Sequence, residues 1–314
     1  MNDQIKRALQ IRYVKLHFEL LFKVDSDNLP VYKPFALRGG LGEMLMEKCC
    51  LSDRNCDSCS FKSECIMQRV FYSKFDDVPY FVTEGGSCGY VIECEDYRRE
   101  IGKGDTLQFQ IILFGKTIAY FPQILDAYIE LGKSGLGADG SEFTVNQVTN
   151  SFREALYKDG LLYREKLKPI TVEEYVYFRM RKRIGHRAVF HTPTKFLIHK
   201  RQIMEFDSSI LLRNIVRRLY MLDLFEGIDI EKINIGLDGF ANNIDVPETA
   251  GQESRYVRNR RFPSRNRKGY FLGGIRGYLD FRELNEDQYA ILLAGELIHV
   301  GKHTSFGYGR YTMV

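Results

Sequence analysis

The chain has 314 residues, with 45 Lys and Arg against 41 Asp and Glu, and 44% of its residues are hydrophobic. This length suits one large domain or two of ordinary size, and the hydrophobic fraction is typical of globular proteins and excludes a disordered chain. No apolar run approaches the length of a membrane span and the first ten residues are polar and charged, so we expect a soluble, cytoplasmic protein with no membrane attachment.

The first half of the chain predicts the element order β-α-β-β-α-β. Apolar side chains alternate over residues 13–23 and predict a strand with one buried face. We expect a helix over 36–47, strands near 89–94 and over 106–114, a helix over 118–132 and a strand over 142–148. This is the order of the ferredoxin-like fold.

The second half predicts the same order. We expect a strand over 189–199, a helix over 208–224, a long hairpin over 254–281, a helix over 286–300 and a strand over 305–313. Pro169 marks a plausible junction between the halves. The predicted fold class is therefore α+β, with two tandem ferredoxin-like domains at 1–168 and 169–314.

A Gly-Lys pair follows the last predicted helix of each half, at Gly132-Lys133 and at Gly301-Lys302, with further glycines close behind. Two unrelated helix ends capped by glycine would also give this pattern. Because the pairs match and each precedes a Gly-x-Gly and a strand, we interpret them as signs of a duplicated domain.

The second of these segments carries the strongest functional signal. Gly301, Gly307 and Gly309 share a short stretch with Lys302, His303 and Arg310. A glycine-dense loop lets the backbone approach a ligand closely, and N–H groups beside Lys and Arg suit a phosphate chain. The glycines follow a helix and precede a strand, unlike those of nucleotide-binding motifs, so we expect this loop to contact RNA.

The predicted hairpin is strongly basic. No acidic residue occurs from Arg255 to Leu279, while aromatic residues alternate with cations there. The alternative is a solvated loop that only maintains solubility. Arginine, however, is the residue whose guanidinium group binds phosphates with two hydrogen bonds and stacks on bases. The candidate RNA contacts are Arg258, Arg260, Arg261, Arg265, Arg267 and Lys268.

Five of the seven cysteines fall within residues 49–65 and predict a metal-binding insertion in the first domain. From Cys50 the spacing is C-x5-C-x2-C-x5-C, and a disulfide is not expected in the cytoplasm. We predict a structural zinc ion held by Cys50 (or Cys49), Cys56, Cys59 and Cys65. An iron–sulfur cluster or a set of unrelated thiols is the alternative.

With these features the chain resembles the CRISPR-associated endoribonucleases that process precursor CRISPR RNA, which belong to the RAMP superfamily. The order Gly-Lys-x-Thr-x-Phe-Gly-x-Gly over 301–309 and the basic segment 260–277 match that family's glycine-rich loop and hairpin. Leu37-Arg38-Gly39 is a supporting match and makes Arg38 an RNA-contact candidate, and the cysteine cluster occurs in one branch of the family.

The resemblance implies RNA cleavage without a metal ion or other cofactor. The ribose 2′-OH attacks the adjacent phosphate and leaves a 2′,3′-cyclic phosphate and a 5′-OH. Family members often use a histidine after the first strand as the base, but residues 24–49 contain none and offer Tyr32 and Lys33 instead. The catalytic candidates are therefore Tyr32, Lys33 and His303.

Two other functions remain open from the sequence. The chain could be a non-catalytic RAMP subunit that binds CRISPR RNA in an effector complex, or a general binder of single-stranded RNA. The partners to consider are CRISPR repeat RNA, other effector subunits and a second copy of the chain in a homodimer.

Overall fold

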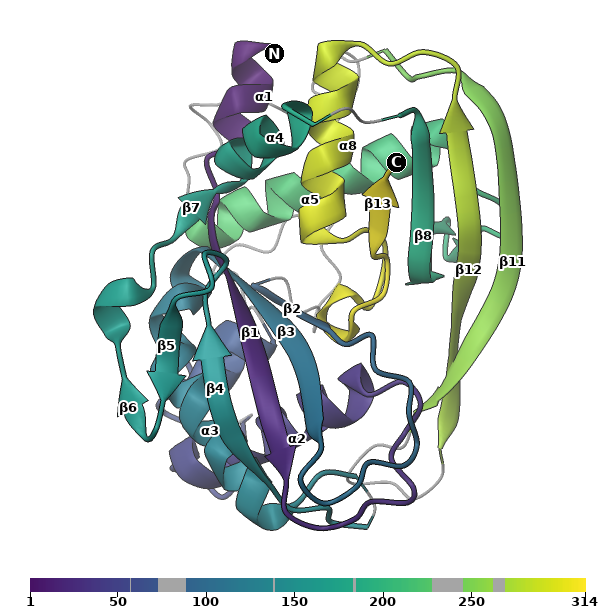
Figure 1. Cartoon of the computed structure of the whole chain (residues 1–314). Coiled ribbons are helices and arrows are strands. Elements are labelled where there is room, and N and C mark those ends of the chain that lie inside the picture. The colour runs from purple at the N-terminus through teal and green to yellow at the C-terminus, as the bar shows by residue number, and fades with distance from the viewer. Residues whose placement is uncertain (57, 73–88, 138, 183–184, 228–244, 262–268) are drawn as a thin grey trace. The chain divides into compact units, whose positions relative to one another are not determined.

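The computed structural model describes residues 1–56, 58–72, 89–137, 139–182, 185–227, 245–261 and 269–314 (Figure 1). These residues form two compact units, which are treated separately below. The N-terminal unit is Tyr13–Pro169, and the C-terminal unit combines Met1–Arg12 with Ile170–Val314. No helix of the described residues is long and apolar enough to cross a membrane.

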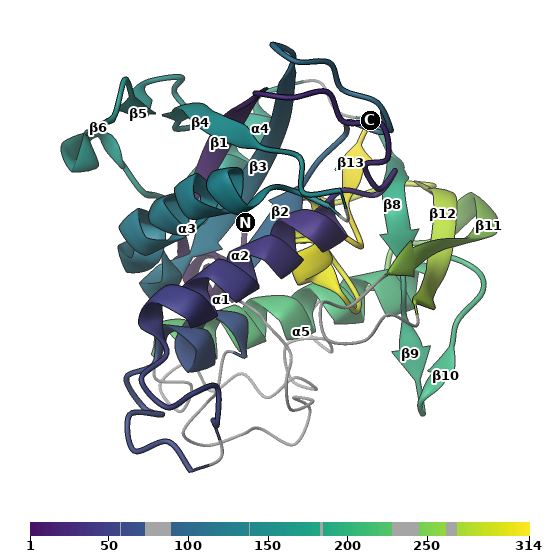
Figure 2. The ribbon, with the colours of Figure 1, turned by 90° about the horizontal axis from the view of Figure 1, so that it is seen from below.

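The N-terminal unit contains β1 (Arg12–Phe22), α2 (Pro34–Cys49), β2 (Tyr90–Glu93), β3 (Thr106–Phe114), α3 (Phe121–Ser134) and β4 (Phe143–Thr149). Its antiparallel sheet has the order β2-β3-β1-β4, which β5 (Ala155–Lys158) and β6 (Leu161–Leu162) extend at one edge. Helices α2 and α3 lie side by side along one face of this sheet (Figure 2). This arrangement is a ferredoxin-like fold.

Strand β1 shows why the N-terminal unit folds in this way. Its alternate apolar side chains, from Val14 to Phe22, are each no more than 3% exposed, whereas the residues between them are partly exposed. The Phe18 ring stacks on Phe109 of β3 and lies 5.2 Å from the ring of Tyr128 on α3. The predicted single buried face is confirmed, and it packs against the helices.

The C-terminal unit repeats the pattern with β8 (Arg187–Thr194), α5 (Ser208–Glu226), β11 (Thr249–Arg261), β12 (Tyr270–Phe281), α8 (Glu286–Ile298) and β13 (Tyr311–Met313). The strand order β11-β12-β8-β13 is the same arrangement as in the N-terminal unit. Two further helices, α1 (Asp3–Ala8) and α4 (Val172–Met180), join this unit. The predicted α+β class with two ferredoxin-like folds is confirmed.

The structure corrects several predicted elements. The strand expected over 189–199 ends at Thr194, because the chain turns into a small hairpin of β9 (Leu197–Ile198) and β10 (Arg201–Gln202). The strand expected over 305–313 begins only at Tyr311, since Gly307 and Gly309 have positive φ and cannot continue a strand. Helix α4 was not predicted, although its capping box of Thr171 and Glu174 is a sequence signal for a helix start.

Candidate nucleic-acid interface

The glycine-rich loop, residues 299–310, joins α8 to β13 in the C-terminal unit. Bonds to the end of β8 hold it: Gly309 N donates to Pro193 O at 3.0 Å, and Thr192 Oγ1 donates to Gly307 O at 2.7 Å. Within the loop, Val300 N donates to Gly309 O at 3.1 Å. These bonds fix the backbone of a segment that is neither helix nor regular strand.

Two glycines of this loop are required by their surroundings. A Cβ at Gly309 would lie 1.8 Å from Val300 O, and one at Gly301 would lie 2.6 Å from Lys195 O. Both also have positive φ, near +74° and +79°. Glycine therefore permits both the turn and the close approach of two backbones.

Two histidines of the loop, His299 and His303, also have positive φ, near 60° and 67°, which is uncommon for residues with a side chain. His299 is buried, with Nδ1 3.1 Å from Tyr308 O. The His303 ring is partly exposed and meets the Tyr308 ring edge-on, with ring centres 5.9 Å apart. His303 is thus the histidine of the loop that combines an unusual backbone with partial access to solvent.

The long hairpin, formed by β11 and β12, contacts the glycine-rich loop and makes one surface with it. The Tyr308 hydroxyl donates to Leu272 O at 3.0 Å and accepts from Asn259 Nδ2 at 3.3 Å. Burial raises the pKa of Tyr308, so this hydroxyl remains a donor. The Arg261 guanidinium lies 4.4 Å from the ring centre of Phe306 and donates to Tyr270 Oη at 2.6 Å. The hairpin and the loop therefore support each other.

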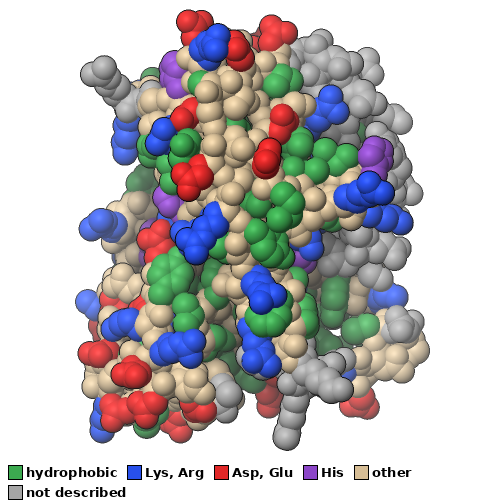
Figure 3. Space-filling model, turned by 90° about the vertical axis from the view of Figure 1, so that its right-hand side faces the viewer, with side chains coloured by type: hydrophobic (Ala, Val, Ile, Leu, Met, Phe, Trp, Pro, Cys, Tyr) green, Lys and Arg blue, Asp and Glu red, His purple; other side chains and the backbone are tan. Residues whose placement is uncertain are grey.

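The arginines of the long hairpin point to different faces. Because side chains alternate along a strand, Asn259 and Arg261 face the glycine-rich loop while Arg258 and Arg260 face the other way. Arg258 lies 4.6 Å from the ring centre of Phe271. On the side of the molecule where β11 lies, Lys and Arg side chains are interspersed with hydrophobic ones (Figure 3). Exposed arginine beside exposed aromatic rings suits phosphate contact together with base stacking.

The structure brings together a subset of the predicted residues. Gly301, Lys302, His303, Gly307, Gly309 and Arg310 form one loop, and Arg258, Arg260 and Arg261 lie on the hairpin that adjoins it. The predicted contacts Arg265, Arg267 and Lys268 lie outside the described residues. Tyr32, Lys33 and Arg38 belong to the N-terminal unit.

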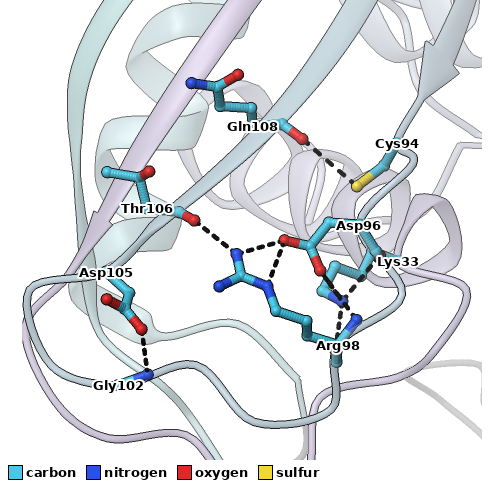
Figure 4. A network of polar contacts seen from close by, with 8 residues as sticks. All are labelled: Lys33, Cys94, Asp96, Arg98, Gly102, Asp105, Thr106 and Gln108. Carbon is cyan, nitrogen blue, oxygen red and sulfur yellow. Dashed lines mark hydrogen bonds and ion pairs between the residues drawn. The ribbon is translucent and has the colours of Figure 1, made fainter.

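Lys33 is fully buried in the N-terminal unit, and Figure 4 shows the bonds of its ammonium group. Its Nζ donates to Asp96 O at 2.9 Å, to Arg98 O at 2.6 Å and to Asp96 Oδ1 at 3.3 Å. Burial lowers the pKa of Lys33, while the Asp96 carboxylate acts in the opposite direction. These three acceptors use all the hydrogens of the ammonium group, and the side chain holds residues 96–98 to the start of α2.

The other two predicted residues of the N-terminal unit also make internal contacts. Tyr32 is 7% exposed and meets the Phe35 ring edge-on, with ring centres 4.9 Å apart. The Arg38 guanidinium lies 4.7 Å from the ring centre of Phe71. Nothing in the sequence signalled the burial of Tyr32, because it follows a polar segment and stands just before Lys33-Pro34.

Lys302 belongs to a group of cations at the other end of the glycine-rich loop. Burial lowers the pKa of Lys302, and the charges of Arg217 on α5 and Lys195 lower it further. Lys195 follows β8, and its carbonyl accepts from Lys302 N at 2.9 Å. The sequence did not identify Lys195 as a candidate, because it fell inside a predicted strand.

The cysteine loop, residues 49–66, connects α2 to a single π-helical turn, Met67–Phe71. Cys49, Cys50, Cys56, Cys59 and Cys65 all line one cavity of about 260 Å³, and none of them forms a disulfide. Arg54 N donates to Cys50 Sγ at 3.1 Å. Burial raises the pKa of Cys49, and the neighbouring Cys65 adds to this effect. Within the described part of the loop, which omits residue 57, no three potential ligands lie close enough to hold a metal ion.

Comparisons with known proteins agree with this architecture. Residues 189–311, which include most of β8, the long hairpin and the glycine-rich loop, match the family described as CRISPR-associated endoribonuclease Cas6. Residues 10–171 match a family model described as an N-terminal domain. No curated protein matches this chain in sequence.

Solved structures share the fold over nearly the whole chain. A product complex of Cas6 from Thermus thermophilus has 15% identity and a TM-score of 0.54, over 96% of this chain and 99% of that one. A Cas6 substrate mimic complex has 15% identity and a TM-score of 0.50, over 97% of this chain and 100% of that one. A partial Cas6-RT-Cas1–Cas2 complex has 11% identity and a TM-score of 0.57, and 97% of this chain covers 46% of that longer one. The C-terminal part of the chain thus matches the Cas6 family model, and the chain shares the fold of the Cas6 structures.

Proposed function

We propose that this protein cleaves precursor CRISPR RNA within its repeats, through attack of the ribose 2′-OH and without a metal ion in the chemistry. The observation that carries the proposal is the continuous surface of the glycine-rich loop and the long hairpin, in the part of the chain that matches the Cas6 family model. That surface offers arginines, exposed aromatic rings and backbone N–H groups to a single RNA strand.

The reaction needs a base for the 2′-OH, an acid for the leaving 5′-oxygen and cations near the phosphate. We place the base at His303, since its ring is partly exposed within the loop and beside Tyr308. Lys302, the adjacent residue, supplies positive charge near the phosphate. Lys33 is less suited to this chemistry because its Nζ already donates to three oxygens inside its own unit.

The test uses a synthetic repeat RNA and purified protein in EDTA. We expect cleavage at one position, with a 2′,3′-cyclic phosphate on the upstream product. The same RNA with 2′-deoxyribose at the scissile nucleotide should bind with similar affinity and stay intact. Normal cleavage of the deoxy substrate would overturn the mechanism, because the nucleophile would be missing.

The alternative is a non-catalytic RAMP subunit that binds CRISPR RNA. The absence of histidine from residues 24–49 and the burial of Lys33 favour it. Tight, repeat-specific binding without cleavage in the same assay would establish this alternative. Binding of any single strand with equal affinity would indicate a general RNA-binding protein instead.

We also infer a structural zinc ion held by Cys50 (or Cys49), Cys56, Cys59 and Cys65. The shared cavity of these thiols and the N–H bond to Cys50 Sγ support the inference, since soft thiolate ligands suit zinc. Ion binding would draw the thiols together, because no three described ligands are close enough in this structure. An ion with four sulfur ligands would stabilise the loop and take no part in RNA cleavage.

Elemental analysis of protein purified without chelator tests the zinc site. We expect about one zinc ion per chain, which should be lost in Cys56→Ser. The ion should be retained in Cys94→Ser, because Cys94 lies outside the cluster at residues 49–65. Thermal unfolding should shift only for the first variant. Metal-free protein whose unfolding does not respond to added zinc would overturn the site, and iron with sulfide would identify a cluster.

A homodimer and binding to other effector subunits stay predictions. Light scattering of the purified protein, alone and with repeat RNA, measures the first. Co-purification with subunits encoded alongside the chain measures the second.

A further inference from the structure

A short basic hairpin follows β8 in the C-terminal unit, and the function proposed above does not use it. The short hairpin, residues 195–202, consists of β9 and β10 and carries Lys195, His199, Lys200 and Arg201. No acidic residue occurs in 195–204. Ile203 N donates to Phe196 O at 3.1 Å and closes the base of the hairpin.

The turn of the short hairpin has an unusual backbone. His199 and Lys200 form its two-residue connection, and both have positive φ, near 47° and 67°. Hairpins of this type normally use Asn and Gly at these positions, because a side chain is disfavoured there. The sequence instead places two large basic side chains at the tip, and both are exposed. Strain kept in a surface turn is a reason to look for a ligand.

The short hairpin contacts the glycine-rich loop directly. Lys302 N donates to Lys195 O at 2.9 Å, and the absence of a Cβ at Gly301 lets the two segments meet. Arg217 on α5 is close enough for its charge to act on Lys302. The 301–302 end of the loop thus meets the short hairpin, whereas Phe306 and Tyr308 meet the long hairpin.

The cations of the short hairpin have no acidic partners among the residues that the structure describes. Lys195, Lys200 and Arg201 form no ion pair with any of them. Like charges gathered in this way repel one another, and a polyanion would relieve that repulsion. Lysine acts on a phosphate as a point charge and reads no base.

We propose that the short hairpin, with Lys302 and Arg217, forms a second phosphate-binding surface that holds the RNA backbone at the 301–302 end of the glycine-rich loop. The proposal rests on the RNA-processing function inferred above and extends it. Its ligand is the phosphodiester backbone of a single strand next to the nucleotides held by the long hairpin. It adds affinity without adding sequence specificity.

The test neutralises the tip with Lys200→Asn and Arg201→Gln together. Asn tolerates positive φ, so the turn should keep its shape. The matched control is Arg181→Gln with Lys182→Gln, which removes the same charge from exposed positions of the same unit. Circular dichroism and thermal unfolding check that both double variants fold as the wild type does.

Binding of repeat RNA is measured between 0.1 and 1 M salt. The tip variant should flatten the log–log salt dependence by about 0.7 per lost contact, or ~1.4 in all. The loss of affinity relative to the wild type should therefore be about 25-fold larger at 0.1 M salt than at 1 M salt. The control should match the wild type. The cleavage position and the single-turnover rate at saturating protein should not change in either variant, because neither residue touches the reacting atoms.

A series of progressively shorter repeat RNAs tests whether the RNA must reach the short hairpin. The difference between wild type and tip variant should vanish once the RNA is too short to reach the short hairpin. A tip variant with the wild-type salt dependence on full-length RNA, beside a wild type that binds and cleaves, would overturn this inference alone. A wild type that neither binds nor cleaves repeat RNA would overturn the proposed function itself.

Discussion

The two units place a glycine-containing loop at the same point of the same fold, after the second helix and before the fourth strand. In the N-terminal unit this loop closes on itself: Leu136 and Ser141 pair in an isolated bridge, and Ser141 Oγ donates to Ser26 Oγ at 2.7 Å. Lys133, in the last turn of α3 before this loop, pairs with Glu130 at 2.8 Å, so the Gly132-Lys133 pair lies inside the helix and does not follow it. The rest of this loop contains acidic residues and no arginine.

The loop of the C-terminal unit differs in what surrounds it. It is longer, it contains His303 and Lys302, and it packs against two basic hairpins. Both loops use glycine at positive φ, so glycine alone does not mark an RNA site. From this difference we expect the cations and hairpins beside the loop to give it its role in RNA binding, because the glycines determine only the course of the backbone.

The largest expected difference between the loops is catalytic. His303→Asn keeps a residue that tolerates positive φ and removes the base, so the single-turnover cleavage rate should fall by about 10²–10⁴. Ser134→Ala, at the end of α3, should cleave at the wild-type rate; Ser134 follows Gly132-Lys133 in the sequence as His303 follows Gly301-Lys302. Quenched time courses at saturating protein measure both.

Two further variants locate the base if this prediction is wrong. If His303→Asn cleaves normally while Tyr32→Phe is slow, the base belongs to the N-terminal unit. Lys33→Met should lower stability more than it lowers the cleavage rate of the folded protein, because Nζ has three internal acceptors.

The next largest effect is expected from glycine substitutions in the two loops, where loss of stability can be distinguished from loss of RNA binding. Gly309→Ala and Gly135→Ala each force a Cβ onto backbone atoms, at 1.8 Å and 2.2 Å, at a residue with positive φ. Backbone strain alone should lower the free energy of unfolding by about 1–3 kcal/mol in each. Only Gly309→Ala should also weaken RNA binding, by more than about tenfold, in titrations where both variants are folded. Equal losses of RNA affinity would break the comparison between the loops.

A smaller effect is expected from the outer face of the long hairpin. Arg258→Ala with Arg260→Ala should weaken RNA binding and flatten its salt dependence by about 0.7 per lost contact, without a change in thermal stability. Arg261→Ala should instead also slow cleavage, because the Arg261 guanidinium packs on Phe306 of the glycine-rich loop. If all three arginines behave alike, the division of the hairpin into two faces has no functional meaning.

The smallest expected effect is a pH dependence of RNA binding. The pKa of Lys302 is lowered by burial and then by Arg217 and Lys195, so this side chain loses its charge at a lower pH than an ordinary lysine. RNA affinity should therefore begin to fall at a lower pH than the titration of an ordinary lysine near 10.4 would give. Lys302→Arg should remove the fall, since arginine stays charged, and Lys133→Arg should leave it unchanged.

Much of the fold could be predicted because it depends on local patterns. The alternation in β1 and the helical spacing in α3 predicted elements within a few residues of their observed bounds. The end of β8 was missed, because a hairpin with His199 and Lys200 in its turn lacks the usual Asn-Gly signal. The late start of β13 was missed because alternating residues at 305–310 resemble a strand until their φ values are known.

The sequence by itself determined the class of fold, the resemblance to the Cas6-type endoribonucleases and the basic, aromatic character of the long hairpin, because periodicity, glycine spacing and clustered arginines can all be read along the chain. Only the tertiary structure decided which of those residues meet. It buried Lys33 under three oxygen acceptors, turned Arg258 and Arg261 to opposite faces of one hairpin, and brought Lys195 to Lys302. The reason is that burial and long-range contact depend on how elements pack, and residues as far apart in the sequence as Lys33 and Asp96, or Lys195 and Lys302, carry no local sign of that packing.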